Sequence, residues 1–245
     1  MWLFYAIFAY FFFAVSVFID RFLLAGPLKN PHLYAFYIGI LNGFALLLVP
    51  VGYLFPLGIA LPPLPHVLLG LLAGFYTVWA LLAWFVFVSK EEVSRAAPGV
   101  GALQPVFVLL LTFLLASGIA EFAPSDIFAF AFFVAGSVVI MMDKFSLQLR
   151  VSNWPLLLVS TFLFALSIVL MKLIFLVQPF FTSVVLLGSG SAIAALSLLA
   201  FSQTRQGLRQ PEKLDRKVLI PFLIGRVAGT LGTGGLLLAI FLAKV

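Results

Sequence analysis

Long apolar stretches separated by short polar segments dominate the chain. A helix that crosses a bilayer needs about 20 mostly apolar residues, and a membrane β-strand has only about 10. An open sheet is excluded because lipid cannot satisfy the hydrogen bonds at its edges. The pattern therefore predicts an all-α polytopic membrane helix bundle with about eight transmembrane helices, at residues 2–24, 33–55, 66–88, 97–119, 126–142, 154–176, 180–201 and 217–242.

Composition supports this class and excludes several functions. Apolar residues make up 64% of the chain and charged residues 9%, whereas a soluble domain has about 25% charged residues. Cysteine is absent, and the two histidines, His32 and His66, lie between apolar stretches, so no metal or other cofactor is expected. Membrane-embedded enzymes need a cluster of metal ligands, paired carboxylates or an activated nucleophile. The sequence has no such cluster, so we do not expect an enzyme.

The two halves of the chain are related by an ungapped shift of 151 residues. The shift brings three successive apolar stretches of the first half onto three of the second. Five helices would separate the copies, and an odd number inverts the second copy across the membrane. This is the inverted-repeat plan of many secondary transporters. The most informative matches are Ser16 with Ser167, Arg21 with Lys172, Gly39 with Gly190, and Gly74 with Gly225.

Basic residues predict the orientation in the membrane. Eleven of them fall in the loops that follow the first, third, fifth and seventh apolar stretches. Cytoplasmic loops carry the excess of Lys and Arg in membrane proteins, so this count places the N-terminus outside. The same rule explains the net positive charge without nucleic-acid binding. The long basic segment at 202–217 is then cytoplasmic and could contact anionic lipid headgroups.

The stretch from Ser94 to Asp143 carries the most distinctive combination of residues. Its features are Ala96-Ala97-Pro98, the core Leu103-Gln104-Pro105-Val106-Phe107, Glu121, and Gly136 before Asp143 and Lys144. Together with the small and basic residues near the ends of two apolar stretches, Ser16 with Arg21 and Ser167 with Lys172, these features resemble the drug/metabolite transporter superfamily, EamA type.

The resemblance implies ten helices in two inverted five-helix repeats, in a secondary carrier that often exports amino acids, metabolites or drugs. On this plan, residues 1–143 form the first repeat with five helices, and residues 154–245 form a second repeat with three. The shift places Val245 on Ser94, so counterparts of the last two helices would lie beyond the last residue. The alternatives are a fragment or a shortened protein that needs a partner chain. The family is usually described with its N-terminus inside, against the charge count, so sidedness stays open.

Arg226 is the most conspicuous candidate for a functional residue. It lies about nine residues into the last apolar stretch, hence about 13 Å from its start, and a buried guanidinium is costly unless it is paired. Thr230 and Thr233 follow at positions i+4 and i+7 on the same helical face. We interpret this face as lining a central cavity in which Arg226 binds an anionic group such as a carboxylate. The alternative is that the membrane span starts later and Arg226 extends to the headgroups.

Three other charged residues lie near the ends of apolar stretches. Asp20, Arg21 and Lys172 are interpreted as anchors at the membrane interface, because long side chains there can reach the headgroups. The alternative is a pair between Asp20 and Arg226 across the cavity, but the position of Asp20 near a helix end argues against it. All eight acidic residues lie at such ends or in loops, which gives proton coupling little support.

Further polar and aromatic residues inside the apolar stretches could line a substrate pathway. Proline removes a backbone hydrogen bond, so Gln104-Pro105 either exposes a carbonyl to a cavity or only bends a helix. Tyr and Trp are also common at membrane interfaces, which leaves Asn42 and Trp79 as the deepest candidates. The full set is Ser16, Tyr37, Asn42, Tyr76, Trp79, Ser167 and Ser191.

Three Gly-X-X-X-Gly pairs permit close approach of helices. They are Gly39 with Gly43, Gly70 with Gly74, and Gly225 with Gly229. Packing within the monomer is the simpler interpretation, and a homodimer is the other. The sequence thus predicts a multi-pass secondary transporter of small metabolites in the inner (plasma) membrane, with a small-molecule substrate, the lipid bilayer as its surroundings, and no cofactor. The alternative function is a non-transporting or incomplete membrane protein.

Overall fold

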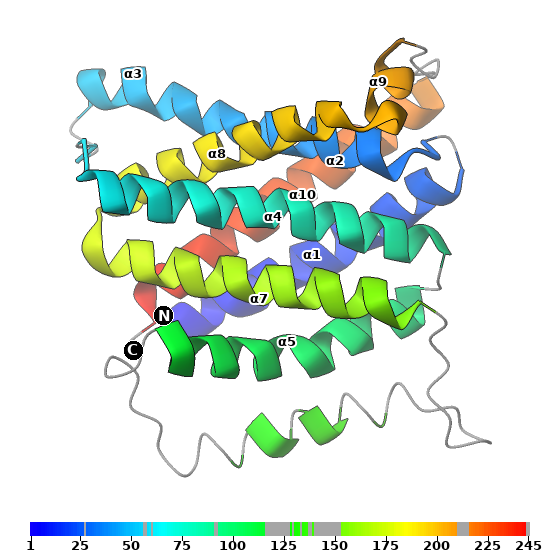
Figure 1. Cartoon of the computed structure of the whole chain (residues 1–245), viewed down its shortest axis with the longest axis horizontal. Helices are drawn as coiled ribbons and strands as arrows, with labels where there is room; N and C mark the ends of the chain where they lie inside the picture. Colours follow the sequence, from blue (N-terminus) through cyan, green and yellow to red (C-terminus); the bar gives the residue numbers. More distant parts are fainter. Residues whose placement is uncertain are drawn as a thin grey trace.

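The computed structural model of the chain is a bundle of helices (Figure 1). It describes residues 1–26, 28–55, 58–59, 61–90, 93–115, 128, 130–132, 134–136, 139, 153–209 and 216–243. Every element within these ranges is a helix, which confirms the all-α fold class. The elements are α1 Trp2–Ala25, α2 Pro31–Asn42, η1 Gly43–Leu47, α3 Leu48–Leu54, α4 Leu64–Lys90, α5 Val93–Leu115, α7 Trp154–Val177, α8 Phe180–Ser197, η2 Leu198–Ala200, α9 Ser202–Arg209 and α10 Arg216–Leu242.

Within the described ranges, six segments are long and apolar enough to cross a membrane. The shortest, Phe180–Ala200, has 21 residues, which corresponds to about 31 Å of helix and matches a hydrocarbon core of about 30 Å. These are the helices of a multi-pass membrane protein. The six segments are Trp2–Ala25, Pro31–Gly52, Leu64–Lys90, Trp154–Val177, Phe180–Ala200 and Val218–Leu242.

The six spans correspond to six of the eight predicted stretches. The fourth stretch, 97–119, is described as far as Leu115, and its described apolar part, Gly99–Leu115, is shorter than each of the six spans. The fifth stretch, 126–142, lies mostly outside the described residues. The boundary predicted between the two repeats, at 144–153, also lies almost entirely outside them. Eight helices in two repeats therefore remain a prediction.

Helices α4, α5, α7 and α8 run nearly parallel or antiparallel to one another, whereas α1 and α10 run obliquely to them (Figure 1). Helix α4 packs along α7 and α8, α5 packs along α7, and α2 packs along α8 and α4. In the view of Figure 1, α1 and α10 lie side by side and cross behind α4 and α7. Large apolar side chains such as Phe4, Phe11 and Phe18 are exposed on the outside of α1, as expected for a surface that faces lipid.

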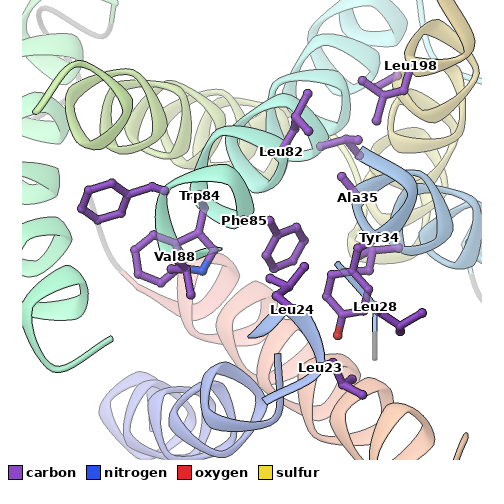
Figure 2. Packing of buried hydrophobic residues seen from close by; sticks show 14 of the residues in the cluster. Leu23, Leu24, Leu28, Tyr34, Ala35, Leu82, Trp84, Phe85, Val88 and Leu198 are labelled. Carbon is purple, nitrogen blue, oxygen red and sulfur yellow. The ribbon is translucent and has the colours of Figure 1, made fainter. Parts of the chain in front are cut away.

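One apolar cluster joins α1, α2 and α4 near one end of the bundle. The ring of Tyr34 lies between Leu24 and Leu28, with its hydroxyl on the side of Leu23, and Phe85 lies on the α4 side (Figure 2). The rings of Tyr34 and Phe85 are 4.9 Å apart in an edge-to-face arrangement, which is favourable for aromatic pairs. This packing fixes the position of the Tyr34 hydroxyl.

The predicted glycine pairs lie against other helices of the same chain. A methyl group at Gly74 would stand 1.9 Å from the carbonyl oxygen of Leu187, and one at Gly190 would stand 2.1 Å from that of Leu71. Backbones this close leave no room for a side chain, so α4 and α8 are joined through these two glycines. Gly74 is a member of a predicted pair, and the other members of the three pairs contact α8 from α2, η1 and α4, or α1 from α10; they are Gly39, Gly43, Gly70, Gly225 and Gly229. This agrees with packing within the monomer, and the homodimer remains a prediction.

Candidate functional site

Asp20 is the centre of a polar network inside the helix bundle. Its carboxylate forms an ion pair with Arg226 of α10 and accepts a hydrogen bond from the Tyr34 hydroxyl of α2. The Ser16 hydroxyl, one turn earlier on α1, lies 3.3 Å from the other carboxylate oxygen. The side chains of Arg226 and Asp20 are 14% and 8% exposed. Three helices thus supply the groups that surround one buried carboxylate.

Arg226 makes further contacts with aromatic groups of the network. Its Nη2 donates a hydrogen bond of 2.8 Å to the Tyr34 hydroxyl. The guanidinium carbon lies 5.0 Å from the centre of the Tyr34 ring and 5.8 Å from that of Phe222, within the range of cation–π attraction. The Nε of Arg226 is buried without a hydrogen-bond partner among the described residues. One donor of the guanidinium therefore remains unused.

The expectation that depth separates Asp20 from Arg226 was wrong. Arg226 lies ten residues after the start of α10, about 15 Å along it, and Asp20 lies five residues before the end of α1, about 7.5 Å from that end. These two helix ends lie on the same side of the bundle (Figure 1). Because Cβ atoms tilt toward the N-terminus of their helix, Arg226 extends toward this side and Asp20 extends away from it. The two head groups therefore meet between the levels of their backbones.

Local sequence places Tyr34 at the same level. Pro31 opens α2, and the side chain of Asn30 accepts hydrogen bonds of 3.1 Å from the backbone nitrogens of His32 and Leu33. Such a cap fixes where a helix begins. Tyr34 was not among the predicted site residues. The signal that could have found it is the short loop between α1 and α2, which brings the first turn of α2 to the level of the last turns of α1.

A second group of polar contacts joins α4, α7 and α8. The Ser167 hydroxyl lies 2.7 Å from the Thr77 hydroxyl and 2.9 Å from the carbonyl oxygen of Ala73. Ser191 of α8 donates to the carbonyl oxygen of Gly74 at 3.2 Å. Ser167 and Ser191 were predicted site residues, whereas Thr77 was not. These hydroxyl groups satisfy carbonyls where helices lie close together.

The remaining predicted pathway residues do not join either group. Trp79 is half-buried against Phe75 and Phe201, and its indole nitrogen is buried without a partner among the described residues. Asn42, Tyr76, Gln104 and Pro105 are half-buried. Thr230 and Thr233 are exposed on α10, while Arg226 of the same helix is mostly covered. Only Ser16 and Arg226 of the predicted set therefore lie together around Asp20.

Arg21 and Lys172, interpreted above as interface anchors, bind helix ends. Arg21 donates to the carbonyl oxygen of Val88 in the last turn of α4. Lys172 donates to the carbonyl oxygens of Ile240, at 3.0 Å, and Ala243 at the end of α10. The last carbonyls of a helix have no partner within it, and a cation there is favourable. Each residue thus ties the first helix of its predicted repeat to the third.

The described residues offer two features that could hold other ligands. A cavity of about 230 Å³ lies between the residues around α3 and helix α8, and its lining comprises Val49, Gly52, Ile59, Leu61, Pro62, Thr182, Val185 and Leu186. A much smaller cleft of about 10 Å³ touches Tyr34 and Tyr37, which is about the space of one water molecule. No group of three or more His, Asp or Glu side chains in the described ranges could hold a metal ion.

Comparison with known proteins assigns this chain to no family. No protein-family model, no curated protein and no solved structure matches it. The polar network around Asp20 and the hydroxyl contacts between α4, α7 and α8 are the features of this site that bear on function.

Proposed function

We propose that this chain is an integral membrane secondary transporter of small solutes, built from two inverted repeats and working by alternating access. The resemblance to the drug/metabolite transporter superfamily is part of this proposal. The observation that carries it is a pair of equivalent contacts between helices of different repeats. The Ser16 hydroxyl of α1 lies 3.3 Å from the carbonyl oxygen of Gly225 on α10. The Ser167 hydroxyl of α7 donates to the carbonyl oxygen of Ala73 on α4.

The shift of 151 residues relates these two contacts. It brings Ser16 onto Ser167, and it brings Gly225 onto Gly74, the neighbour of Ala73. The first helix of each repeat thus binds the third helix of the other repeat. A two-fold axis in the membrane plane would produce such reciprocal contacts between two repeats.

The contacts of the basic residues support the same relation. The shift brings Arg21 onto Lys172, and it brings Val88 onto position 239, the neighbour of Ile240. Here the first and third helices belong to the same repeat. Both kinds of contact are polar, so they are less prone to chance agreement than apolar matches. In inverted-repeat carriers, one repeat moves against the other around a site between them.

Orientation in an inner (plasma) membrane completes the proposal. The end of α1, the end of α4 and helix α9 lie on one side of the bundle (Figure 1), and this side carries Arg21, Lys90, Arg205 and Arg209. Positive loops favour the cytoplasm. We therefore place this side, and with it the Asp20 network, toward the cytoplasm and the N-terminus outside.

A reversible cross-link between α1 and α10 tests alternating access. A Cβ at Gly229 would stand 4.0 Å from the Cβ of Ser16, a separation that suits a disulfide. The chain has no cysteine of its own, so the Ser16→Cys/Gly229→Cys variant needs no further changes. We expect counterflow of labelled amino acids, organic acids or nucleotides into proteoliposomes to stop on oxidation and to return on reduction. Each single variant, treated with the same oxidant, serves as control.

Two outcomes would contradict the proposal. One is full transport by the protein whose cross-link has been verified by mobility on a gel. The other is the absence of counterflow for every solute in the panel with the unmodified protein.

A further inference from the structure

We infer that the Asp20–Arg226 pair is the binding site for a small carboxylate anion and a proton, which are taken up together. The anion binds to Arg226 and the proton binds to Asp20. This inference rests on the proposed transport function and names the substrate class and the coupling ion at the same site.

Charge balance inside the bundle is the first step of the argument. Asp20 and Arg226 together carry no net charge, and both side chains are largely removed from solvent. A buried charge without a partner is strongly unfavourable. An anion that bound to Arg226 alone would leave two negative charges beside one positive charge. If a proton from water binds the Asp20 carboxylate at the same time, the site stays neutral throughout.

The resident partner of Arg226 indicates the chemical class of the anion. Asp20 is itself a carboxylate, and it is held by donors from Arg226, Tyr34 and Ser16. A ligand that replaces it on Arg226 must satisfy the same donors. The unused Nε of Arg226 adds a donor beside Nη2, and a guanidinium edge with two donors matches the two oxygens of a carboxylate. The site is therefore built for a carboxylate rather than for a neutral solute.

Among the charged and titratable groups around Asp20, the Asp20 carboxylate is the group that accepts the proton. Arg226 of α10 and Tyr34 of α2 are the charged or titratable side chains in contact with it within the described ranges. Arg21, the next residue on α1, is engaged with the Val88 carbonyl of α4, and α4 contributes the apolar Phe85 against Tyr34. Tyr34 donates to Asp20 and accepts from Arg226, so it links the two charges. Protonation of Asp20 removes its charge and frees the guanidinium for the anion.

The repeat relation predicts no second site of this kind at the place equivalent to Asp20. The shift of 151 residues brings Asp20 onto Met171, Tyr34 onto Val185, and Arg226 onto Phe75. Met171 is buried in an apolar cluster with Leu170 and Phe175. The equivalent place at the other end of the bundle thus carries no charge. One proton should accompany each carboxylate group that binds.

Two measurements with the full-length chain test the inference. In nanodiscs without buffer, succinate, L-glutamate or 2-oxoglutarate should cause uptake of one proton per bound anion, whereas succinamide and L-glutamine should cause none. In proteoliposomes with a pH indicator inside, an effective anion added outside should acidify the lumen. The Val227→Ala variant, changed at a neighbouring exposed position of α10, should behave like the unmodified chain.

Variants of the pair separate proton binding from anion binding. The Asp20→Asn variant mimics a permanently protonated Asp20, so it should still bind and exchange the anion but take up no proton. The Arg226→Gln variant should lose both anion binding and proton uptake. The Asp20→Glu variant keeps the titratable group and should retain proton uptake. It serves as the control that shows whether loss of proton uptake in Asp20→Asn follows from removal of the proton site or from misfolding.

The outcomes of this test and of the transport test are distinguishable. Carboxylate transport without proton movement, unchanged in Asp20→Asn, would overturn this inference and leave the transporter standing. The absence of proton uptake with all three anions in nanodiscs would also overturn it, whatever other solute is carried. Proton-linked binding without any transport would support this site and reject the transport function.

Discussion

Gly74 of α4 lies directly against the backbone of Leu187 of α8, so that a Cβ at Gly74 would stand 1.9 Å from the Leu187 carbonyl oxygen. The obstacle is backbone, which cannot rotate away as a flexible side chain can. The contact of Gly190 with Leu71 repeats the arrangement in the opposite direction along the same two helices. The separation of α4 and α8 is therefore set by the absence of two side chains.

The Gly74→Ala variant tests this close approach. We expect it to lower the free energy of unfolding by about 1–3 kcal/mol, because α4 and α8 must move apart to admit the methyl group. Thermal unfolding in detergent measures the change. The matched control is Gly234→Ala on α10, where nothing lies within 4 Å of the added Cβ, and where alanine should stabilise the helix by up to about 1 kcal/mol. Equal effects of the two substitutions would contradict the packing described here.

The Asp20–Arg226 pair predicts a strong energetic coupling. Removing one partner of a buried ion pair leaves a charge without compensation, which costs about 3–5 kcal/mol. We therefore expect both Asp20→Asn and Arg226→Gln to be strongly destabilising. The free energy of unfolding of the double variant should fall by much less than the sum of the two single effects, because no charge remains buried. Unfolding of the four proteins under the same conditions gives the coupling energy directly, and additive effects would show that the two side chains do not interact.

Lys172 predicts a local effect at the end of α10. Its hydrogen bonds to the carbonyl oxygens of Ile240 and Ala243 are charge-assisted, and such bonds contribute about 1.5–3 kcal/mol each when they are made. The Lys172→Ala variant should expose the last turn of α10, which amide hydrogen exchange measures residue by residue. Lys172→Arg keeps the cation and should retain most of the protection. An unchanged exchange rate in Lys172→Ala would mean that the last turn does not depend on this side chain.

The helices themselves were largely predictable from local sequence. Among the described residues, six of the eight predicted apolar stretches are spans, and their ends agree closely with the prediction, as for Trp154–Val177 against 154–176. The second stretch is less regular than predicted, since the 3-10 segment Gly43–Leu47 interrupts it. Periodicity in an apolar run cannot reveal this interruption, because almost every position along the run is apolar.

The candidate site was only partly predictable. Arg226 stood out because a guanidinium in an apolar run is costly wherever it points. Its partner did not stand out, because Asp20 lies near a helix end where an interface role explains it equally well. Thr230 and Thr233 were grouped with Arg226 by helical spacing, yet they are exposed. The flexible arginine reaches beyond its own helical face, and the short threonines cannot.

The amino-acid sequence is enough to predict that this chain forms membrane-spanning helices. The physical reason is that lipid offers no hydrogen-bond partners, so an apolar run long enough to cross the bilayer must satisfy its backbone internally as a helix. Which polar groups meet depends on how the helices pack. Asp20 and Arg226 are 206 positions apart, and their contact depends on the packing of α1 against α10 and on the direction in which each side chain leans. Neither quantity is a property of a local stretch of sequence.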